Sequence, residues 1–324
     1  MVISAIGTIW LFGIRIEPSA LLLRTYTDKF ASATAIETDH YAPQTSVSRK
    51  ANQNYGAGGV ETSFDVYRPT SAGKKKLPAV FWVHGGGWIG GSKDFVAPFL
   101  RKMASAGYTV VGLNYPLAPT HQYPSVIAAL NDAFDYVIDR SAAYGVDTSN
   151  IVLAGNEVGA NMVSQIAALT TNSTYAAETG LESGLTKIQL KGVVLNGGIY
   201  DVAATQSLTG LARWRTNTQL WATTGSRDWA QTAAGEQIST IDGISRSFPP
   251  TWMAAGDMDP LTAQQSVPFA TRLAASGVAV TTIFPDQGAN LPADFQFMLA
   301  LPAAKRAFGS MLDFIALVTS STVS

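Results

Sequence analysis

Glu157 stands at the centre of a Gly-X-Glu-X-Gly sequence, within the segment IVLAGNEVGAN at residues 151–161. The apolar run before the first glycine predicts a strand and the residues after the turn predict a helix, a pattern typical of a sharp strand-turn-helix. In turns of the Gly-X-Ser-X-Gly type, the central residue is a serine nucleophile held above the edge of a sheet. The chain therefore carries a carboxylate where such turns carry a hydroxyl.

A glycine-rich loop is the second place where the sequence could do chemistry. The segment VFWVHGGGWIGGSKDF, residues 80–95, takes an apolar strand into a His-Gly-Gly-Gly-Trp sequence. Glycines without Cβ let neighbouring amide N–H groups converge on one point, and such amides stabilise negative charge that develops in a transition state. The order of this loop, the turn at Glu157 and the later Asp259 favours a site over a merely flexible turn.

With these motifs the chain resembles the hormone-sensitive-lipase-like carboxylesterases of the α/β-hydrolase fold, over about residues 60–320. Two further segments support the resemblance: VVGLNYPLAPTHQYP at 110–124 and PPTWMAAGDMDPL at 249–261. The resemblance implies an α/β fold with a mostly parallel central sheet, helices on both faces and a helical cap. It implies cleavage of small acyl esters by a serine, a histidine and an acid, with Asp259 in the acid's place. The oxyanion-hole donors would be the amides of Gly86, Gly87 and Val158.

Two departures from the family pattern change the expected chemistry. Glu157 replaces the serine, and the segment GANLPADFQFML at 288–299 has Ala293 where the family has its histidine. No other histidine can replace it, because none follows residue 121 in the chain. A serine triad needs both groups, so ordinary serine esterase activity is expected to be absent.

We expect Glu157 to act as a general base for proton abstraction or elimination beside the glycine loop. A carboxylate on a strained turn near apolar Trp88 should be partly desolvated and therefore more basic. Asn156 and Asn161 flank the turn and are expected to line the pocket, with one or the other orienting Glu157. Asp259, without a histidine, is expected to accept backbone hydrogen bonds in its own loop.

Two other functions remain open on the sequence. One is a catalytically dead pseudoenzyme that binds a small apolar ligand in the old acyl pocket. The other is a hydrolase that uses Glu157 as a covalent nucleophile, although no histidine is available to activate water against its ester. Loss of both serine and histidine, with the glycine loop and acid turn kept, is the pattern expected when selection or design exchanges the reactive groups of a pocket.

Composition excludes several classes of function. The formal net charge is −1 and basic residues are not clustered in long runs, which argues against nucleic acid as a partner. The chain has no cysteine, so thiolate catalysis and disulfides are excluded and the compartment is not indicated. Histidines and carboxylates lack metal-ligand spacing, and no cofactor is implied.

Short apolar runs that alternate with helical patterns must position these motifs. Strands are predicted at 62–67, 79–84, 109–113, 151–154, 190–195, 251–255 and 278–284, and helices at 126–140, 158–169 and 302–318. Residues 1–50 are interpreted as an N-terminal cap, 51–324 as the α/β-hydrolase domain, and 203–245 as a cap insertion whose tryptophans pack on the core. Residues 171–186 are expected to be an exposed insertion.

The amino terminus is apolar but short. Residues 2–14 contain no charge, yet the run ends at Arg15 and is too short to span a bilayer. No signal peptide is evident, so a soluble protein is expected, in which this segment packs as part of the cap. Contact with a membrane surface is the alternative. The sequence does not indicate the oligomeric state.

Overall fold

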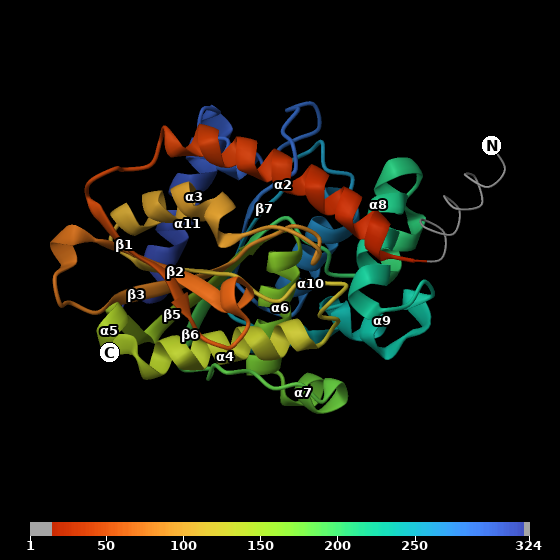
Figure 1. The fold of residues 1–324 in the computed structure, drawn as a ribbon, viewed down its shortest axis with the longest axis horizontal. Coiled ribbons are helices and arrows are strands. Elements are labelled where there is room, and N and C mark those ends of the chain that lie inside the picture. Colours follow the sequence, from red (N-terminus) through yellow and green to blue (C-terminus); the bar gives the residue numbers. More distant parts are fainter. Residues whose placement is uncertain (1–14, 321–324) are drawn as a thin grey trace.

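The protein is built on an eight-stranded sheet, seen in a computed structural model that describes residues 15–320 (Figure 1). The strand order is β1-β2-β4-β3-β5-β6-β7-β8. Strands β3 to β8 pair in parallel, while β2 is antiparallel to both β1 and β4. The strands are β1 (Val47–Asn54), β2 (Ser63–Pro69), β3 (Leu77–Val83), β4 (Thr109–Leu113), β5 (Val146–Asn156), β6 (Leu190–Asn196), β7 (Thr251–Ala254) and β8 (Val280–Ile283).

The predicted strands are all present, and β1 is an addition. The central strands are continuous apolar runs because helices cover both faces of a parallel sheet. Strand β1 has the sequence VSRKANQN and lies mostly exposed at the sheet edge, so it carries no apolar period that a sequence pattern could detect. It also crosses the boundary drawn at residue 50, which means that the sheet begins within the segment interpreted as cap.

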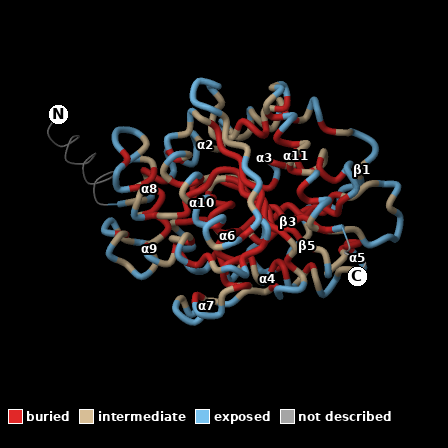
Figure 2. Tube along the Cα trace, turned by 180° about the vertical axis from the view of Figure 1, so that it is seen from behind, coloured by how far each residue is buried: buried red, intermediate tan, exposed pale blue. Residues whose placement is uncertain are grey.

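Helices form a layer on each face of the sheet. One apolar core joins the sheet to α4 and α6, and a second joins it to α3 and α11. Figure 2 shows the resulting buried centre, with exposed segments along the periphery. The helices are α2 (Glu17–Asp39), α3 (Lys93–Ser105), α4 (Ser125–Asp139), α5 (Ser141–Tyr144), α6 (Val158–Thr171), α7 (Ser173–Thr179), α8 (Gly210–Thr224), α9 (Ala233–Ile238), α10 (Val267–Ala275) and α11 (Pro302–Thr319).

The cap consists of α2 together with the segment that contains α8 and α9. Helix α2 packs across α3 and reaches α8, so the amino-terminal segment and the 203–245 segment meet over one end of the sheet (Figure 1). Of the three tryptophans in this segment, Trp229 is buried, whereas Trp214 is 39% exposed. The apolar residues 2–14 lie outside the described residues. Within residues 15–320, no helix has the length and apolar character needed to cross a membrane.

Residues 171–186 are less exposed than expected. Helix α7 lies in this segment, and Tyr175 and Leu185 are buried against the core. The Tyr175 hydroxyl accepts a hydrogen bond from Gln165 of α6 at 3.1 Å. The segment therefore packs onto α6 on one side, which its Thr- and Ser-rich composition conceals.

Candidate active site

The turn at Glu157 has the strained geometry that its sequence predicts. Glu157 joins β5 to α6 with φ 49° and ψ −120°, a backbone conformation that L-residues rarely adopt. Its amide N–H donates to the Asn196 carbonyl at 2.9 Å. Gly159 is required because a Cβ there would lie 2.1 Å from the Val83 carbonyl oxygen. The close approach of α6 to β3 therefore holds Glu157 above the carboxyl end of the sheet.

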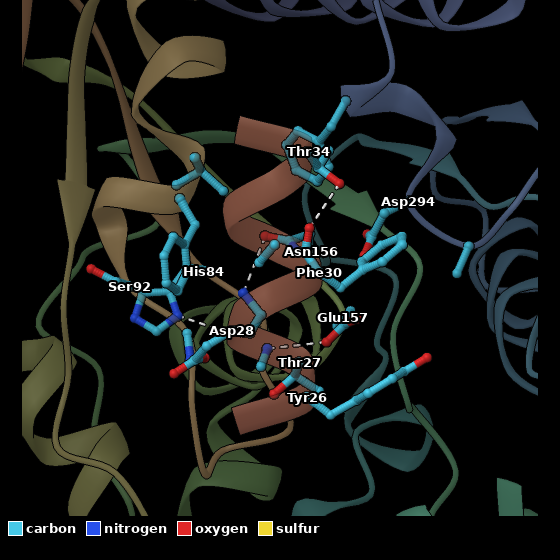
Figure 3. Close-up of a pocket in the computed structure, with 18 of the residues that line it drawn as sticks. Tyr26, Thr27, Asp28, Phe30, Thr34, His84, Ser92, Asn156, Glu157 and Asp294 are labelled. Carbon is cyan, nitrogen blue, oxygen red and sulfur yellow. Dashed lines mark hydrogen bonds between the residues drawn. The ribbon is translucent and has the colours of Figure 1, made fainter. Parts of the chain in front are cut away.

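The Glu157 carboxylate accepts a hydrogen bond from one of the expected oxyanion-hole donors, the Gly86 amide. The Gly86 amide N–H donates to Glu157 Oε2 at 3.0 Å (Figure 3). The left-handed φ of Gly86, +118°, turns the loop so that this amide faces the turn. Among the described residues, no acceptor is bonded to the amides of Gly87 or Val158. Both residues line the smaller cavity, whereas the Gly86 amide is bonded to Glu157.

Asn156 and Asn161 do not orient Glu157, contrary to expectation. Asn156 Oδ1 accepts from Trp82 Nε1 at 3.3 Å and from the Gly85 amide at 3.1 Å, so this side chain fixes the glycine loop. Asn161 is buried in α6, and its Nδ2 donates to two backbone carbonyls, at 2.6 and 2.8 Å, in the loop after β6 and at the end of α9. A short amide side chain satisfies the nearest backbone groups, and here these belong to other elements.

Trp88 was expected beside Glu157, but its side chain packs into the core. It is 2% exposed, belongs to the apolar cluster that includes α4 and α6, and lines neither cavity of the site. Its φ of 61° turns the chain after the third glycine of the loop. The apolar surroundings of Glu157 are supplied by other residues.

A cavity of about 260 Å³ lies between Glu157 and α2. Its polar floor includes Glu157, Asn156 and Asp294, and α2 covers it (Figure 3). Aromatic side chains from three parts of the chain complete the wall: Tyr26, Phe30, Phe95 and Phe297. A smaller cavity of about 50 Å³ lies on the other side of Glu157, against Gly87, Val158 and Gln219. Four residues line both cavities: Glu157, Arg215, Ala293 and Asp294.

Asp294 is a residue of the candidate site that the sequence motif did not single out. Ala293 lines both cavities together with Glu157, and its methyl side chain provides no reactive group. The next residue places a second carboxyl against Glu157. Burial, the charge of Glu157 and a hydrogen bond between the two carboxyl groups raise the pKa of Asp294 well above its ordinary value. The signal was present as Ala293-Asp294-Phe295, but only the loop's conformation shows which of the two faces the turn.

Asp259 and Arg215 are the other two ionisable residues that line the smaller cavity. Asp259 Oδ1 accepts the Leu261 amide N–H at 3.0 Å, the backbone hydrogen bond expected for it, and the residue also lines the smaller cavity. Burial raises the pKa of Asp259, although the Leu261 amide and the positive charge of Arg215 oppose the shift. Arg215 reaches the site from α8, and its buried Nε has no hydrogen-bond partner among the described residues. Sequence patterns offered no means of placing this arginine.

Of the three histidines, His84 alone lines a cavity of the site, the larger one. Burial lowers the pKa of His84 to about 4, and its neutral ring stacks on Tyr115 beneath the glycine loop. His121 lies at the surface opposite Glu61, and neither His40 nor His121 lines a cavity of the site. In the described part of the chain, no three His, Asp or Glu side chains are grouped so as to hold a metal ion.

Comparison with known proteins finds a matching family model and several esterases among the proteins similar to this chain. The BD-FAE family model matches residues 64–273. The esterase LipQ of Mycobacterium tuberculosis is 28% identical over 86% of this chain, and an esterase of Gibberella moniliformis is 26% identical over 68%. The chain covers 63% of LipQ and 69% of the Gibberella protein, but only 32% of a putative α/β hydrolase of Acanthamoeba polyphaga mimivirus that is 36% identical over 110 residues.

Solved structures share the fold over nearly the whole chain. Esterase B from Lactobacillus rhamnosis superposes with a TM-score of 0.76 at 19% identity, covering 93% of this chain and 96% of that one. A bacterial heroin esterase superposes with a TM-score of 0.70 at 18% identity, covering 92% and 91%. At this level of identity the likeness establishes the α/β-hydrolase fold, and the reactive groups must be judged from the residues present.

Proposed function

The chain belongs to the BD-FAE family and is carboxylesterase-like, and we propose that its pocket performs proton transfer with Glu157 as the general base instead of serine ester hydrolysis. The observation that carries the proposal is the Glu157 carboxylate itself, held on the strained turn and bonded to the Gly86 amide at 3.0 Å. This geometry keeps a charged acceptor at the floor of a cavity walled by aromatic side chains. A small, largely apolar molecule with an acidic C–H group is the substrate that fits.

Backbone amide donors lie close enough to the base to stabilise negative charge that develops on such a substrate. Because the Gly86 amide is bonded to Glu157, the charge would be met by the amides of Gly87 and Val158 in the smaller cavity, which Arg215 also lines. Preorganised donors of this kind are worth more in a cavity that excludes water. Abstraction of a proton next to a carbonyl group, leading to elimination or isomerisation, is the reaction class that uses both the base and these donors.

A second candidate is covalent hydrolysis through Glu157, and the position of Asp294 favours it. The objection from sequence was the lack of a base to activate water against a glutamyl ester. Once Glu157 is esterified its charge is gone, so Asp294 ionises more readily and can accept a proton from water. Intact-mass measurement during turnover of an activated acyl ester distinguishes the two candidates, because only the covalent route adds the acyl group to the protein.

The test of the base role compares the protein with Glu157→Gln on a base-labile elimination substrate. Glutamine keeps the size of the side chain and an oxygen that accepts the Gly86 hydrogen bond, but it cannot take a proton. We expect the rate to fall by about 10²–10⁴-fold, the usual contribution of a positioned general base. Glu178→Gln, on the exposed side of α7, is the matched control and should leave the rate unchanged.

Retention of the elimination rate in Glu157→Gln refutes the base role. A rate equal to buffer in both proteins refutes proton transfer altogether and directs attention to ligand binding in the 260 Å³ cavity. Circular dichroism of both variants checks that the turn has not unfolded.

A further inference from the structure

The floor of the cavity holds two carboxyl groups, and the proton-transfer mechanism proposed above uses only one of them, Glu157. Glu157 and Asp294 come from the turn after β5 and from the loop after β8, and both line the larger and the smaller cavity. In Figure 3 the two labelled side chains lie beside α2, with Asp294 above Glu157. A hydrogen bond between the two carboxyl groups is one of the causes that raise the pKa of Asp294, after burial and the charge of Glu157, and such a bond forms only when one of the two carries a proton.

The surroundings indicate which carboxyl carries that proton. Glu157 Oε2 accepts the Gly86 amide N–H at 3.0 Å, a bond that stabilises the charged form of Glu157. Asp294 has a weaker donor, the Gln296 side-chain amide at 3.3 Å from Oδ1. Of its charged neighbours, Glu157 and Asp259 raise its pKa and Arg215 opposes them, but burial and Glu157 have the larger effects. Two adjacent carboxylates cannot both ionise without a large electrostatic cost, so the proton resides on Asp294.

We infer that Asp294 is the second catalytic residue of the site, a general acid that shares one proton with the base Glu157. The inference rests on the proposed function and adds to it the proton donor and the class of leaving group. In the step, Glu157 takes the proton from the C–H group next to a carbonyl, and the C–H electron pair forms the new carbon-carbon double bond. The bond from the β-carbon to oxygen breaks, and the departing oxygen takes the proton from Asp294.

The pair restores itself without another reactant. After the step Glu157 is protonated and Asp294 is ionised, the reverse of the starting state. The hydrogen bond between the two carboxyl groups carries the proton from Glu157 back to Asp294. No histidine is needed for this exchange, and the charges of the pair sum to −1 before and after.

A general acid matters only for a poor leaving group, and this defines the substrate class. An alkoxide or hydroxide must be protonated as it leaves, whereas a stable phenolate need not be. We therefore expect β-hydroxy or β-alkoxy carbonyl compounds as substrates, with an apolar body against Phe30, Phe95 and Phe297. Asp294→Asn is the decisive variant, because asparagine keeps a hydrogen-bond donor toward Glu157 but cannot give up a proton.

The experiment measures kcat/KM for Asp294→Asn on two matched β-substituted ketones, one leaving ethoxide and one leaving para-nitrophenolate. We expect a loss of about 10²–10⁴-fold for the ethoxide substrate and less than about threefold for the nitrophenolate substrate. The alkaline limb of the pH profile should disappear with the acid. A merely structural role would slow both substrates alike, and equal losses, or no loss with either, overturn the inference.

A carboxyl titration keeps the inference testable if neither ketone reacts. With aspartate labelled with ¹³C at the side-chain carboxyl, the resonance missing from Asp294→Asn belongs to Asp294. We expect this carboxyl to stay protonated at a pH where exposed aspartates are ionised, and its midpoint to fall in Glu157→Gln. If wild-type protein equals Glu157→Gln with both ketones, the proposed function fails; if Asp294 titrates identically in wild type and Glu157→Gln, the shared proton fails.

Discussion

Replacing Asp294 by asparagine should make the folded protein more stable relative to wild type as the pH rises. In wild type the pKa of Asp294 is raised by burial first, and then by the charge and hydrogen bond of Glu157. In the unfolded chain the same group ionises near its ordinary value of 3.8. The folded state therefore retains a proton that the unfolded state releases, and asparagine removes this difference without removing the hydrogen-bond donor.

The sign and the size of this pH dependence follow from the single proton that the folded state retains on Asp294. Below pH 3.8 both states of wild type are protonated, and the contribution of Asp294 to stability is fully present. Above that pH the unfolded state gains stability by ionising, so the free energy of unfolding falls by about 1.4 kcal/mol per pH unit until the pH passes the raised pKa of the folded state. The pKa of Asp259 is also raised, but Asp259 is present in both proteins and largely cancels from the difference.

The assay is urea-induced unfolding of wild type and Asp294→Asn at unit steps from pH 4 to pH 7. The difference between the two free energies of unfolding should change steadily with pH in favour of the variant. Asp139→Asn, at an exposed position on α4, is the matched control and should give a constant difference. A constant difference for Asp294→Asn as well would mean that Asp294 ionises like an exposed aspartate, and the reasoning about the shared proton would be refuted.

Three further outcomes are expected. The double variant Glu157→Ser/Ala293→His should turn over an activated short acyl ester at least about 10³-fold faster than Glu157→Ser alone, because a catalytic serine and histidine act as a unit. Equal rates for the two variants would contradict the resemblance at Ala293. Asn161→Ala should lower the free energy of unfolding by about 2–4 kcal/mol in urea titrations, since it leaves two buried carbonyls without donors, and a cost near zero would show that water replaces the amide. Gly159→Ala should cost about 3 kcal/mol or more, because its Cβ would lie 2.1 Å from the Val83 carbonyl oxygen; near-wild-type stability would mean that α6 can shift away from β3.

Local sequence was sufficient for the scaffold and for the position of the reactive group. Continuous apolar runs predicted the central strands because a parallel sheet is buried on both faces. The glycine spacing around residue 157 predicted the strained turn, since only small residues allow a helix to pass so close to a neighbouring strand. The lack of any histidine after residue 121 led to the prediction, without reference to structure, that a serine triad is absent. Strand β1 was not predicted from the sequence, because its exposed polar residues follow no apolar period.

The partners of Glu157 were decided only by the tertiary structure. Asn156 and Asn161 adjoin the turn in sequence, yet their amides bond elsewhere, because a short side chain satisfies the backbone groups that packing brings nearest. Asp294 and Arg215 lie far from Glu157 in the chain and reach it from a loop and a cap helix. A sequence pattern reports the period of one element at a time, whereas the grouping of Glu157, Asp294 and Arg215 around the same cavities depends on how three distant elements meet in space.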